Sequence, residues 1–298
     1  MGAIETEMRV LLVGHSGQLG KCIEREIGSE VNLINFDHKN HKILEISKLR
    51  EPITSIKPDV ILNAAAWTDV DGAETEKELA RQANAIIPRN FAIIASELDI
   101  PFYQISTDYV FSGNSSSPWE VNSPTVPRTI YGVTKLEGER LSLENYPEGT
   151  RILRTAWLYS SFRKNFAKTM VKLALKNSDN ICVVSDQIGQ PTSAVDLAKQ
   201  IYLCLSSDLN PGVYHATNSG VASWNEFAQE IFLLVGADPA RVKEINSSDL
   251  EVATPRPNYS VLSHKCWENT GIAAMSHWRE SLTNQIDNIK DSVIKEGL

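Results

Sequence analysis

Tyr131 and Lys135 stand four positions apart in the stretch YGVTK, directly after the proline-rich segment SPTVPRTI. Residues at this spacing lie on one face of a helix, so a phenol and an ammonium group could address the same ligand. A tyrosine with its ordinary pKa of about 10 is a poor acid near neutral pH, and a neighbouring cation lowers that pKa. The pair is therefore a candidate proton donor with its partner, and an ordinary helix surface is the alternative.

Two hydroxyl groups, Ser106 and Thr107, begin the stretch STDYVF at the end of an apolar run, 101–106, that we expect to form a strand. Open α/β sheets bind their ligands at the carboxyl ends of their strands. Thr107 or Ser106 could therefore hold a carbonyl oxygen that Tyr131 protonates. This combination is more specific than the tyrosine and the lysine alone.

A glycine turn, GHSGQLG, follows the first apolar run and opens an expected helix. In this setting Gly14 permits the tight turn, Gly17 lets a diphosphate approach the backbone, and Gly20 allows close packing of helix on strand. The amide groups at the helix start then face the anion. Together with the hydroxyl and the Tyr–Lys pair, the turn completes a hydride-transfer site that uses a nicotinamide dinucleotide.

Asp37, at the end of the second expected strand, could accept hydrogen bonds from the ribose hydroxyls of that dinucleotide. A carboxylate at this position disfavours a 2′-phosphate, whereas His15, His38 and Lys39 could tolerate one. The sequence therefore predicts NADPH or NADH as cofactor and leaves the choice between them open.

Strands and helices alternate along the chain, which predicts an α/β protein with a Rossmann-type doubly wound parallel sheet and a smaller C-terminal substrate-binding lobe. The expected dinucleotide-binding domain covers 8–157, with a later segment at about 193–215 returning to it, and the sugar-nucleotide lobe covers mainly 158–298. Expected strands are 9–13, 31–36, 59–65, 101–106 and 151–157, and expected helices are 18–28, 75–98, 130–146, 164–177, 193–206, 223–236 and 278–294. The segment 112–129 is rich in Ser and Pro, and we expect a functional loop there.

The composition excludes several classes of function. A net charge of −8 disfavours nucleic acid and anionic lipid as partners. No apolar run reaches the roughly 20 residues of a membrane span. The N-terminus MGAIET matches a myristoylation pattern, but no basic segment follows it, and it lacks the features of a secretory signal. Four scattered cysteines and six unpaired histidines indicate a cytoplasmic protein without a metal site.

Several longer stretches, in the same order along the chain, resemble extended short-chain dehydrogenase/reductases, and among them the dTDP-4-dehydrorhamnose reductase family. They are GHSGQLG, PDVILNAAAWTDVDGAE, STDYVFSG, YGVTKLEGE, RTAWLY, NFAKTM and VVSDQIGQPT, and the resemblance runs from Met8 to about Trp278. It implies NAD(P)H-dependent reduction of the C4 keto group of a dTDP-sugar, dTDP-4-dehydrorhamnose, to dTDP-L-rhamnose for lipopolysaccharide or cell-wall polysaccharide. A monomer or a homodimer is expected.

The resemblance implies roles for single residues. Tyr131 matches the proton donor, Lys135 its partner, and Thr107 the hydroxyl that orients the keto group. The candidate cofactor contacts are Gly14, His15, Gly17, Gln18, Leu19, Asp37, Glu45, Ile46, Ala64, Ala65, Ala66, Ile105, Tyr131 and Lys135, and the candidate substrate contacts are Thr107, Asp108, Trp157 and Arg256. Cys22 stands where some relatives carry a carboxylate of a metal-mediated dimer contact, which argues against such pairing here.

Three further features have two interpretations each. Residues 67–71 could reach the crevice or simply cap a helix, since TDVDGAE offers Asp and Thr to free amide groups. Arg256 in TPRPN could hold the diphosphate of a nucleotide-sugar through its fork of donors, or belong to a rigid surface turn. Lys168 could do the same, although a single lysine on a helix is usually only solvated.

Two other functions remain open at this point. One is another nucleotide-sugar 4-ketoreductase, for example an enzyme that forms 6-deoxy-L-talose, which differs only in how the pocket presents the sugar. The other is a non-catalytic regulatory subunit of the same fold, as in the partner of methionine adenosyltransferase, which the chain resembles distantly. The presence of Thr107, Tyr131 and Lys135 argues against the regulatory subunit.

Overall fold

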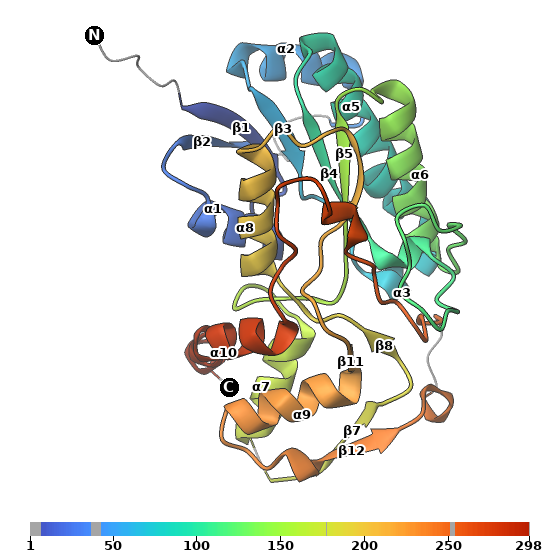
Figure 1. Ribbon diagram of the computed structural model, residues 1–298, viewed down its shortest axis with the longest axis vertical. Coiled ribbons are helices and arrows are strands. Elements are labelled where there is room, and N and C mark those ends of the chain that lie inside the picture. The colour runs from blue at the N-terminus through green and yellow to red at the C-terminus, as the bar shows by residue number, and fades with distance from the viewer. Residues whose placement is uncertain (1–6, 37–42, 177, 251–253, 298) are drawn as a thin grey trace.

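The computed structural model describes residues 7–36, 43–176, 178–250 and 254–297. At its centre is a six-stranded parallel sheet with strand order β10-β5-β4-β3-β1-β2 (Figure 1). The strands are β1 (Met8–Val13), β2 (Val31–Phe36), β3 (Val60–Asn63), β4 (Phe102–Thr107), β5 (Thr150–Thr155) and β10 (Gly212–His215). The predicted doubly wound parallel sheet is confirmed.

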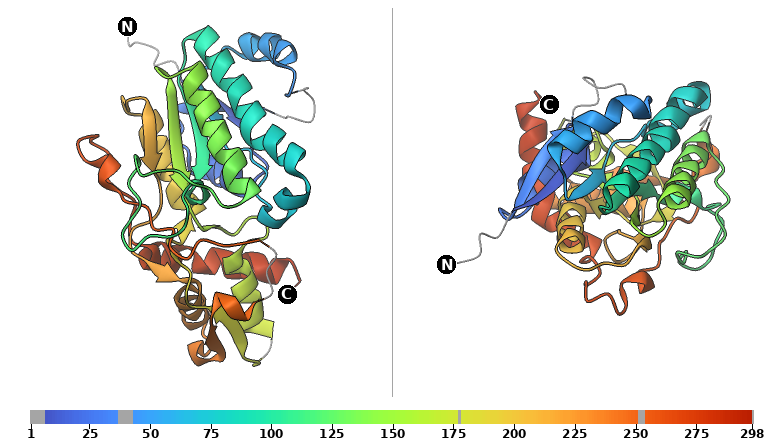
Figure 2. Two further views of the ribbon diagram at one scale, coloured as in Figure 1. Left: turned by 90° about the vertical axis from the view of Figure 1, so that its right-hand side faces the viewer. Right: turned by 90° about the horizontal axis from the view of Figure 1, so that it is seen from above.

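Helices cover both faces of this sheet (Figure 2). On one face lie α1 (Gln18–Glu26) and α8 (Ala194–Leu205), and on the other α2 (Ile46–Ile56), α5 (Ile87–Leu98) and α6 (Ile130–Asn145). The sequence of β1 shows why both faces are needed. Val10 and Leu12 point into one apolar core, whereas Leu11 and Val13 point into the other, and all four are fully buried.

The expected long helix at 75–98 is interrupted. The chain forms α4 (Lys77–Arg81), a π-helical turn (Gln82–Ile86) and then α5. The π turn carries the buried Asn84, whose amide nitrogen donates to Thr134 Oγ1 at 3.1 Å and whose amide oxygen accepts from Trp67 N at 2.9 Å. The extra residue of the turn thus positions one amide between α6 and the loop after β3.

Two helices have no counterpart among the expected elements. Pro52 lies inside α2, where a proline normally argues against a helix, so the apolar spacing alone does not reveal it. α3 (Val70–Thr75) is short and begins after Asp69, whose side chain accepts a hydrogen bond from Gly72 N at 2.9 Å. The capping interpretation of TDVDGAE therefore holds for Asp69.

A second lobe lies beyond the carboxyl ends of the strands (Figure 1). It contains α7 (Phe166–Lys176), α9 (Trp224–Leu234) and α10 (Trp278–Lys295), which share an apolar core with β7 (Ile181–Val184) and β12 (Val242–Ile245). Two short strand pairs, β6 (Leu158–Tyr159) with β9 (Thr192–Ser193) and β8 (Ile188–Gly189) with β11 (Ala222–Ser223), complete it. Among the described residues, no helix combines the length and apolar character needed to cross a membrane.

The loop at 112–129 contains no regular helix or longer strand, as expected. It is attached through the ring of Trp119, which stacks on Phe111 with centroids 4.9 Å apart, and through a β-bridge between Trp119 and Leu262. Its last residue, Thr129, caps α6 by accepting a hydrogen bond from Gly132 N at 3.0 Å. The loop therefore ends at the helix that carries Tyr131 and Lys135.

Candidate active site

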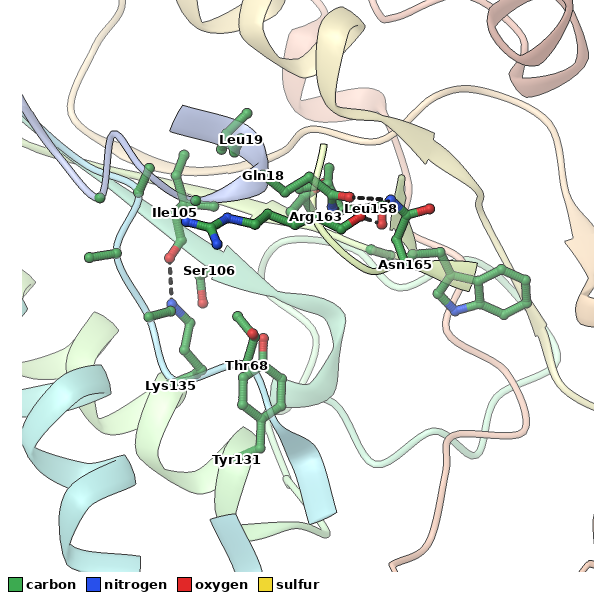
Figure 3. Close-up of a pocket in the computed structure, with 18 of the residues that line it drawn as sticks. Gln18, Leu19, Thr68, Ile105, Ser106, Tyr131, Lys135, Leu158, Arg163 and Asn165 are labelled. Atoms are coloured by element: carbon green, nitrogen blue, oxygen red, sulfur yellow. Dashed lines mark hydrogen bonds between the residues drawn. The ribbon is translucent and has the colours of Figure 1, made fainter. Parts of the chain in front are cut away.

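A cavity of about 820 Å³ lies between the carboxyl ends of the strands and the second lobe (Figure 3). The structure brings most of the predicted site residues together around it. Gly14, Gly17, Gln18, Leu19, Ala64, Ala65, Ala66, Ile105, Tyr131, Lys135 and Trp157 all line the cavity. Thr68 and Val70 line it as well, so the segment 67–71 both reaches the cavity and supplies a helix cap.

The glycine turn is shaped for close approach of a ligand. Gly14 has φ +89°, and a Cβ on it would lie 2.5 Å from Ala65 N, so no other residue fits there without displacement. Gly17 is the N-cap of α1 and has no side chain to occupy the free amide groups of the first turn. Helix amides that face a cavity form a site for an anion such as a dinucleotide diphosphate.

Tyr131 is half-buried at the second position of α6, and its ring packs edge-on against Tyr109 with centroids 5.4 Å apart. Burial raises the pKa of Tyr131 to about 12, a hydrogen bond with the Thr107 side chain acts in the opposite direction, and the charge of Asp108 adds to the rise. The phenol is therefore protonated throughout the neutral range, which a proton donor requires.

Lys135 is buried, and its Nζ donates a hydrogen bond to the carbonyl oxygen of Ile105 at 2.6 Å (Figure 3). Burial lowers the pKa of this lysine to about 8, while the nearby Glu139 carboxylate opposes the shift. Burial, Thr107 and Asp108 account for the shifted pKa of Tyr131, and the lowering of that pKa by Lys135 stays a prediction. The ammonium group is held at the end of β4, and burial dominates the acidity of the phenol.

Thr107 and Asp108 are buried and do not line the cavity. Thr107 Oγ1 donates to Asp108 Oδ1 at 3.0 Å and accepts from Tyr109 N at 3.2 Å. Burial raises the pKa of Asp108 to about 6, although hydrogen bonds from Ser260 and Thr107 counteract it. The neighbouring Ser106 does line the cavity, but its hydroxyl donates to Glu139.

Several predicted contacts lie away from the cavity wall. His15 does not line the cavity, and its Nδ1 lies 3.6 Å from Glu24 Oε1. Glu45 and Ile46 begin α2, and Ile43 rather than either of them lines the cavity. Asp37, with His38 and Lys39, lies outside the described residues, as does the N-terminal stretch MGAIET.

The two predicted cations of the second lobe already have partners. Arg256 Nη2 donates to Asp71 Oδ2 at 2.8 Å, and hydrogen bonds from Thr254 and Arg256 lower the pKa of Asp71. Lys168 is buried and pairs with Glu296 at 2.5 Å. Arg256 does not line the cavity, and its contact with a diphosphate stays a prediction.

Aromatic rings form the second-lobe wall of the cavity. The indole of Trp157 stacks on that of Trp224 with centroids 3.6 Å apart and planes at 8°, and Phe166 packs against Trp224 at 4.5 Å. Trp157 has φ +48°, a conformation that non-glycine residues rarely adopt. A Cβ on Gly189 would lie 2.5 Å from the Trp157 ring, so glycine makes room for the indole on that side.

The cavity wall includes residues that the sequence did not indicate, and four of them carry polar or aromatic groups of interest. Thr155 follows the pattern of Thr107 at the end of the next strand, and its buried hydroxyl has no hydrogen-bond partner among the described residues. Arg163, Asn165 and Trp224 also line the cavity. The basic and amide residues of FRKNF are of a type that binds anions. They lie far from the glycine turn in the sequence, so the sequence does not show that they contact it.

The residues present fit a dinucleotide. The cavity is lined by the start of α1 with its free amides, by the small side chains of Ala64, Ala65 and Ala66, and by Thr155, whose Oγ1 has no hydrogen-bond partner among the described residues. Groups of three or more His, Cys, Asp or Glu arranged to hold a metal do not occur in the part of the chain that the structure describes. The lining side chains offer hydrogen bonding, charge and phenolic protons, among them that of Tyr131.

Comparisons with known proteins agree in one family. The family described as RmlD substrate binding domain matches residues 8–291. A dTDP-4-dehydrorhamnose reductase of Streptomyces griseus is 40% identical over 92% of each chain, and a probable dTDP-4,6-dihydroxy-2-methyloxan-3-one 4-ketoreductase of Streptomyces antibioticus is 38% identical over 95% of this chain and 96% of its own. The crystal structure of dTDP-4-dehydrorhamnose reductase from Bacillus anthracis in complex with NADP superposes with a TM-score of 0.90 at 35% identity, covering 94% of this chain and 99% of that one.

Proposed function

The chain belongs to the RmlD family of dTDP-4-dehydrorhamnose reductases, and from this membership we propose that it reduces the C4 keto group of dTDP-4-dehydrorhamnose to give dTDP-L-rhamnose, with NADPH or NADH as reductant. One observation carries the proposal. A protonated phenol, that of Tyr131, lines a cavity that runs from the glycine turn to the Trp157 indole.

Binding of the cofactor is assigned to the sheet side of the cavity. Gly14, Gly17, Gln18 and Leu19 would hold the diphosphate, and Ala64, Ala65, Ala66 and Ile105 would flank the rest of the dinucleotide. His15, Asp37, Glu45 and Ile46 remain proposed contacts of the adenosine half. The bound nicotinamide supplies the hydride for C4.

Tyr131 supplies the proton. Its raised pKa keeps the proton on the phenol until negative charge develops on the keto oxygen, and the oxygen then takes it. Thr107 lies next to the phenol, and its hydroxyl donates to Asp108 Oδ1 at 3.0 Å, so Asp108 holds the Thr107 side chain in place and the phenolic proton stays available for the keto oxygen. Lys135, held at the Ile105 carbonyl, would contact the ribose next to the nicotinamide and offset the charge that the phenolate carries after transfer.

The experiment follows the loss of dihydronicotinamide absorbance when the protein is mixed with NADPH and with keto sugar made enzymatically from dTDP-glucose. NMR of the product then distinguishes L-rhamnose from 6-deoxy-L-talose. Absence of turnover together with tight cofactor binding would favour the regulatory subunit. Turnover to a different 6-deoxy sugar would favour another 4-ketoreductase, for which the Streptomyces antibioticus relative is the supporting observation.

Further parts of the proposal concern the setting of the enzyme. We assign residues 8–157 to the dinucleotide-binding domain and 158–298 mainly to the sugar-nucleotide lobe. The segment at about 193–215 belongs to the first domain, because β10 is a strand of the large sheet and α8 packs on that sheet. The net charge of −8 supports a protein that binds no nucleic acid. We place it in the cytoplasm, as a monomer or homodimer.

A further inference from the structure

Arg163 reaches from the second lobe to the glycine turn. It lies between β6 and α7, and its Nε and Nη2 donate to the carbonyl oxygen of Ser16 at 2.9 and 2.7 Å. Arg163, Ser16 and Gly17 all line the cavity. Figure 3 shows the side chain extending toward Gln18 and Ile105, beside the start of α1.

The backbone conformation of Arg163 is one that favours glycine, which indicates that the arginine side chain has a function at this position. Its φ is +57°, in the left-handed region that favours glycine. The residue is exposed, so apolar packing does not explain an arginine in this conformation. Non-glycine residues held in such conformations cluster at ligand sites, where the surrounding structure maintains them.

The charge of Arg163 is not neutralised by the protein around it. The acceptor of both of its hydrogen bonds is an uncharged carbonyl, and among the described residues no carboxylate lies within ion-pair distance of it. A guanidinium has five donors, and two hydrogen bonds leave others available for a ligand. Gly17 N donates to the Gly14 carbonyl oxygen, so the free amides at the start of α1 begin at Gln18, two residues after Ser16, and both sets of donors flank the same part of the cavity.

A second contact holds this segment in place beside the turn. Asn165 Nδ2 donates to Gln18 Oε1 at 2.8 Å, and Gln18 Nε2 donates to the carbonyl oxygen of Leu158 at 3.0 Å. The amide pair therefore ties the second lobe to the first residue of α1. With its segment fixed, Arg163 loses little further freedom when it contacts a ligand.

We infer that Arg163 binds the diphosphate of the dinucleotide, so that one binding residue for the cofactor comes from the sugar-nucleotide lobe. This inference rests on the proposed function for the identity of the anion. Arginine pairs with phosphate oxygens through two parallel hydrogen bonds, and helix amides add the positive end of the α1 dipole. Binding of the cofactor would then draw on both lobes.

The test compares Arg163→Gly with a matched control, Lys57→Gly. Lys57 is also an exposed cation with a positive φ, +52°, but it ends α2 and does not line the cavity. Both variants lose one charge and gain the residue that their backbone favours, so we expect an equal or higher Tm for each ligand-free protein. Calorimetric titration with NADP+, and with NAD+ alongside, should give a Kd about tenfold higher for Arg163→Gly only.

Salt dependence and a conservative variant separate ligand contact from a structural role. A contact between exposed charges weakens as ionic strength rises, so the Kd of the wild-type protein should increase more steeply with NaCl than that of Arg163→Gly. Arg163→Lys keeps the charge and should restore part of the affinity. An unchanged Kd for Arg163→Gly would overturn the inference about Arg163. So would a loss of affinity that keeps the wild-type salt dependence and is not rescued by lysine. Neither result would affect the proposed function. If the wild-type protein binds neither dinucleotide, the proposed function fails with it.

Discussion

The phenol of Tyr131 is subject to opposing influences on its acidity. Burial and the charge of Asp108 raise its pKa, and the hydrogen bond with Thr107 lowers it. The result keeps the proton on the oxygen at neutral pH, where reduction of a ketone needs a donor rather than a base. At the residue scale, the site therefore offers a protonated phenol that can donate its proton to the keto oxygen as the sugar is reduced.

Replacing Tyr131 by phenylalanine removes the proposed proton donor and keeps the ring that packs against Tyr109. We expect kcat to fall by about 10²- to 10⁴-fold, with the Kd for NADPH nearly unchanged. Steady-state kinetics and calorimetry measure the two quantities. Tyr146→Phe, at the other end of α6, is the matched control and should keep kcat. Normal turnover by Tyr131→Phe would remove the assigned role.

Lys135 should give the stability of the protein a specific pH dependence. Its pKa is lowered from 10.5 to about 8 in the folded state, so between these values the unfolded chain binds more protons, and stability rises with pH. From pH 8 to 10 the rise is about 2 kcal/mol. Below pH 8 the lysine is charged in both states and the dependence vanishes.

The comparison with Lys135→Met isolates this contribution. Buried thiols such as Cys22 and Cys204 have raised pKa values and destabilise the fold as pH rises through the same range, so only the difference between the two proteins is informative. Urea unfolding at pH 8, 9 and 10 should give a difference that changes by about the amount stated, in favour of the wild type at high pH. A constant difference would mean that the pKa of Lys135 is not lowered in the folded protein, so that the lysine stays charged in both states over this range.

How far the sequence predicts the site depends on the distance between the contacting residues. Tyr131 and Lys135 share one helix, and the glycine turn joins one strand to one helix, so local spacing is sufficient to place them. Arg163 meets Ser16 across 147 positions of the chain, and no local pattern records that contact. The left-handed backbone of Arg163 is equally invisible, because the residue type argues against it.

At the element scale, a buried ion pair connects the parts that carry the site. Arg154 on β5 donates through Nε and Nη2 to the carboxylate of Glu139 on α6, at 3.0 and 2.7 Å, and through Nη1 to the carbonyl of Val121 in the loop at 112–129. Glu139 also accepts from Ser106 at the end of β4. The pair thus fixes the helix of Tyr131 against the strand that ends in Thr107.

Glu139→Gln should therefore destabilise the fold strongly, because it leaves the Arg154 charge buried without its partner. We expect a loss of about 3–5 kcal/mol in the free energy of unfolding, measured with urea. Glu137→Gln is the control on the same helix. It breaks the largely exposed pair with Arg81 and should change stability by less than about 1 kcal/mol. Similar effects from both substitutions would contradict the bracing role of Glu139.

The elements themselves differ in how clearly the sequence reveals them. β1 and β4 were predictable because parallel strands buried on both faces are continuous apolar runs. α2 was not, since Pro52 lies in its interior. The π turn before α5 keeps a helical pattern of apolar residues, and tertiary contacts of Asn84 with Trp67 and Thr134, rather than local preference, account for its extra residue.

At the scale of the whole molecule, two parts of the fold contribute different residues to the cavity. The sheet and the helices that cover it carry the glycine turn and the Tyr–Lys pair. The second lobe contributes the aromatic wall and Arg163. The Trp157 indole in that wall lies against Trp224, with the small Gly189 beside it. Because the backbone of Trp157 is in a conformation that costs energy, the stacking partner must help to hold the ring where it is.

Trp224 should therefore affect sugar binding without affecting cofactor binding. We expect Trp224→Ala to raise KM for the keto sugar by about tenfold while the Kd for NADPH stays the same, since losing the stacked ring frees Trp157. Trp224→Phe keeps a stacking surface and should recover most of the affinity. Kinetics at saturating NADPH and calorimetry measure the two effects. Equal losses for sugar and cofactor would show that the aromatic wall supports the whole cavity, and its assignment to sugar binding alone would then be wrong.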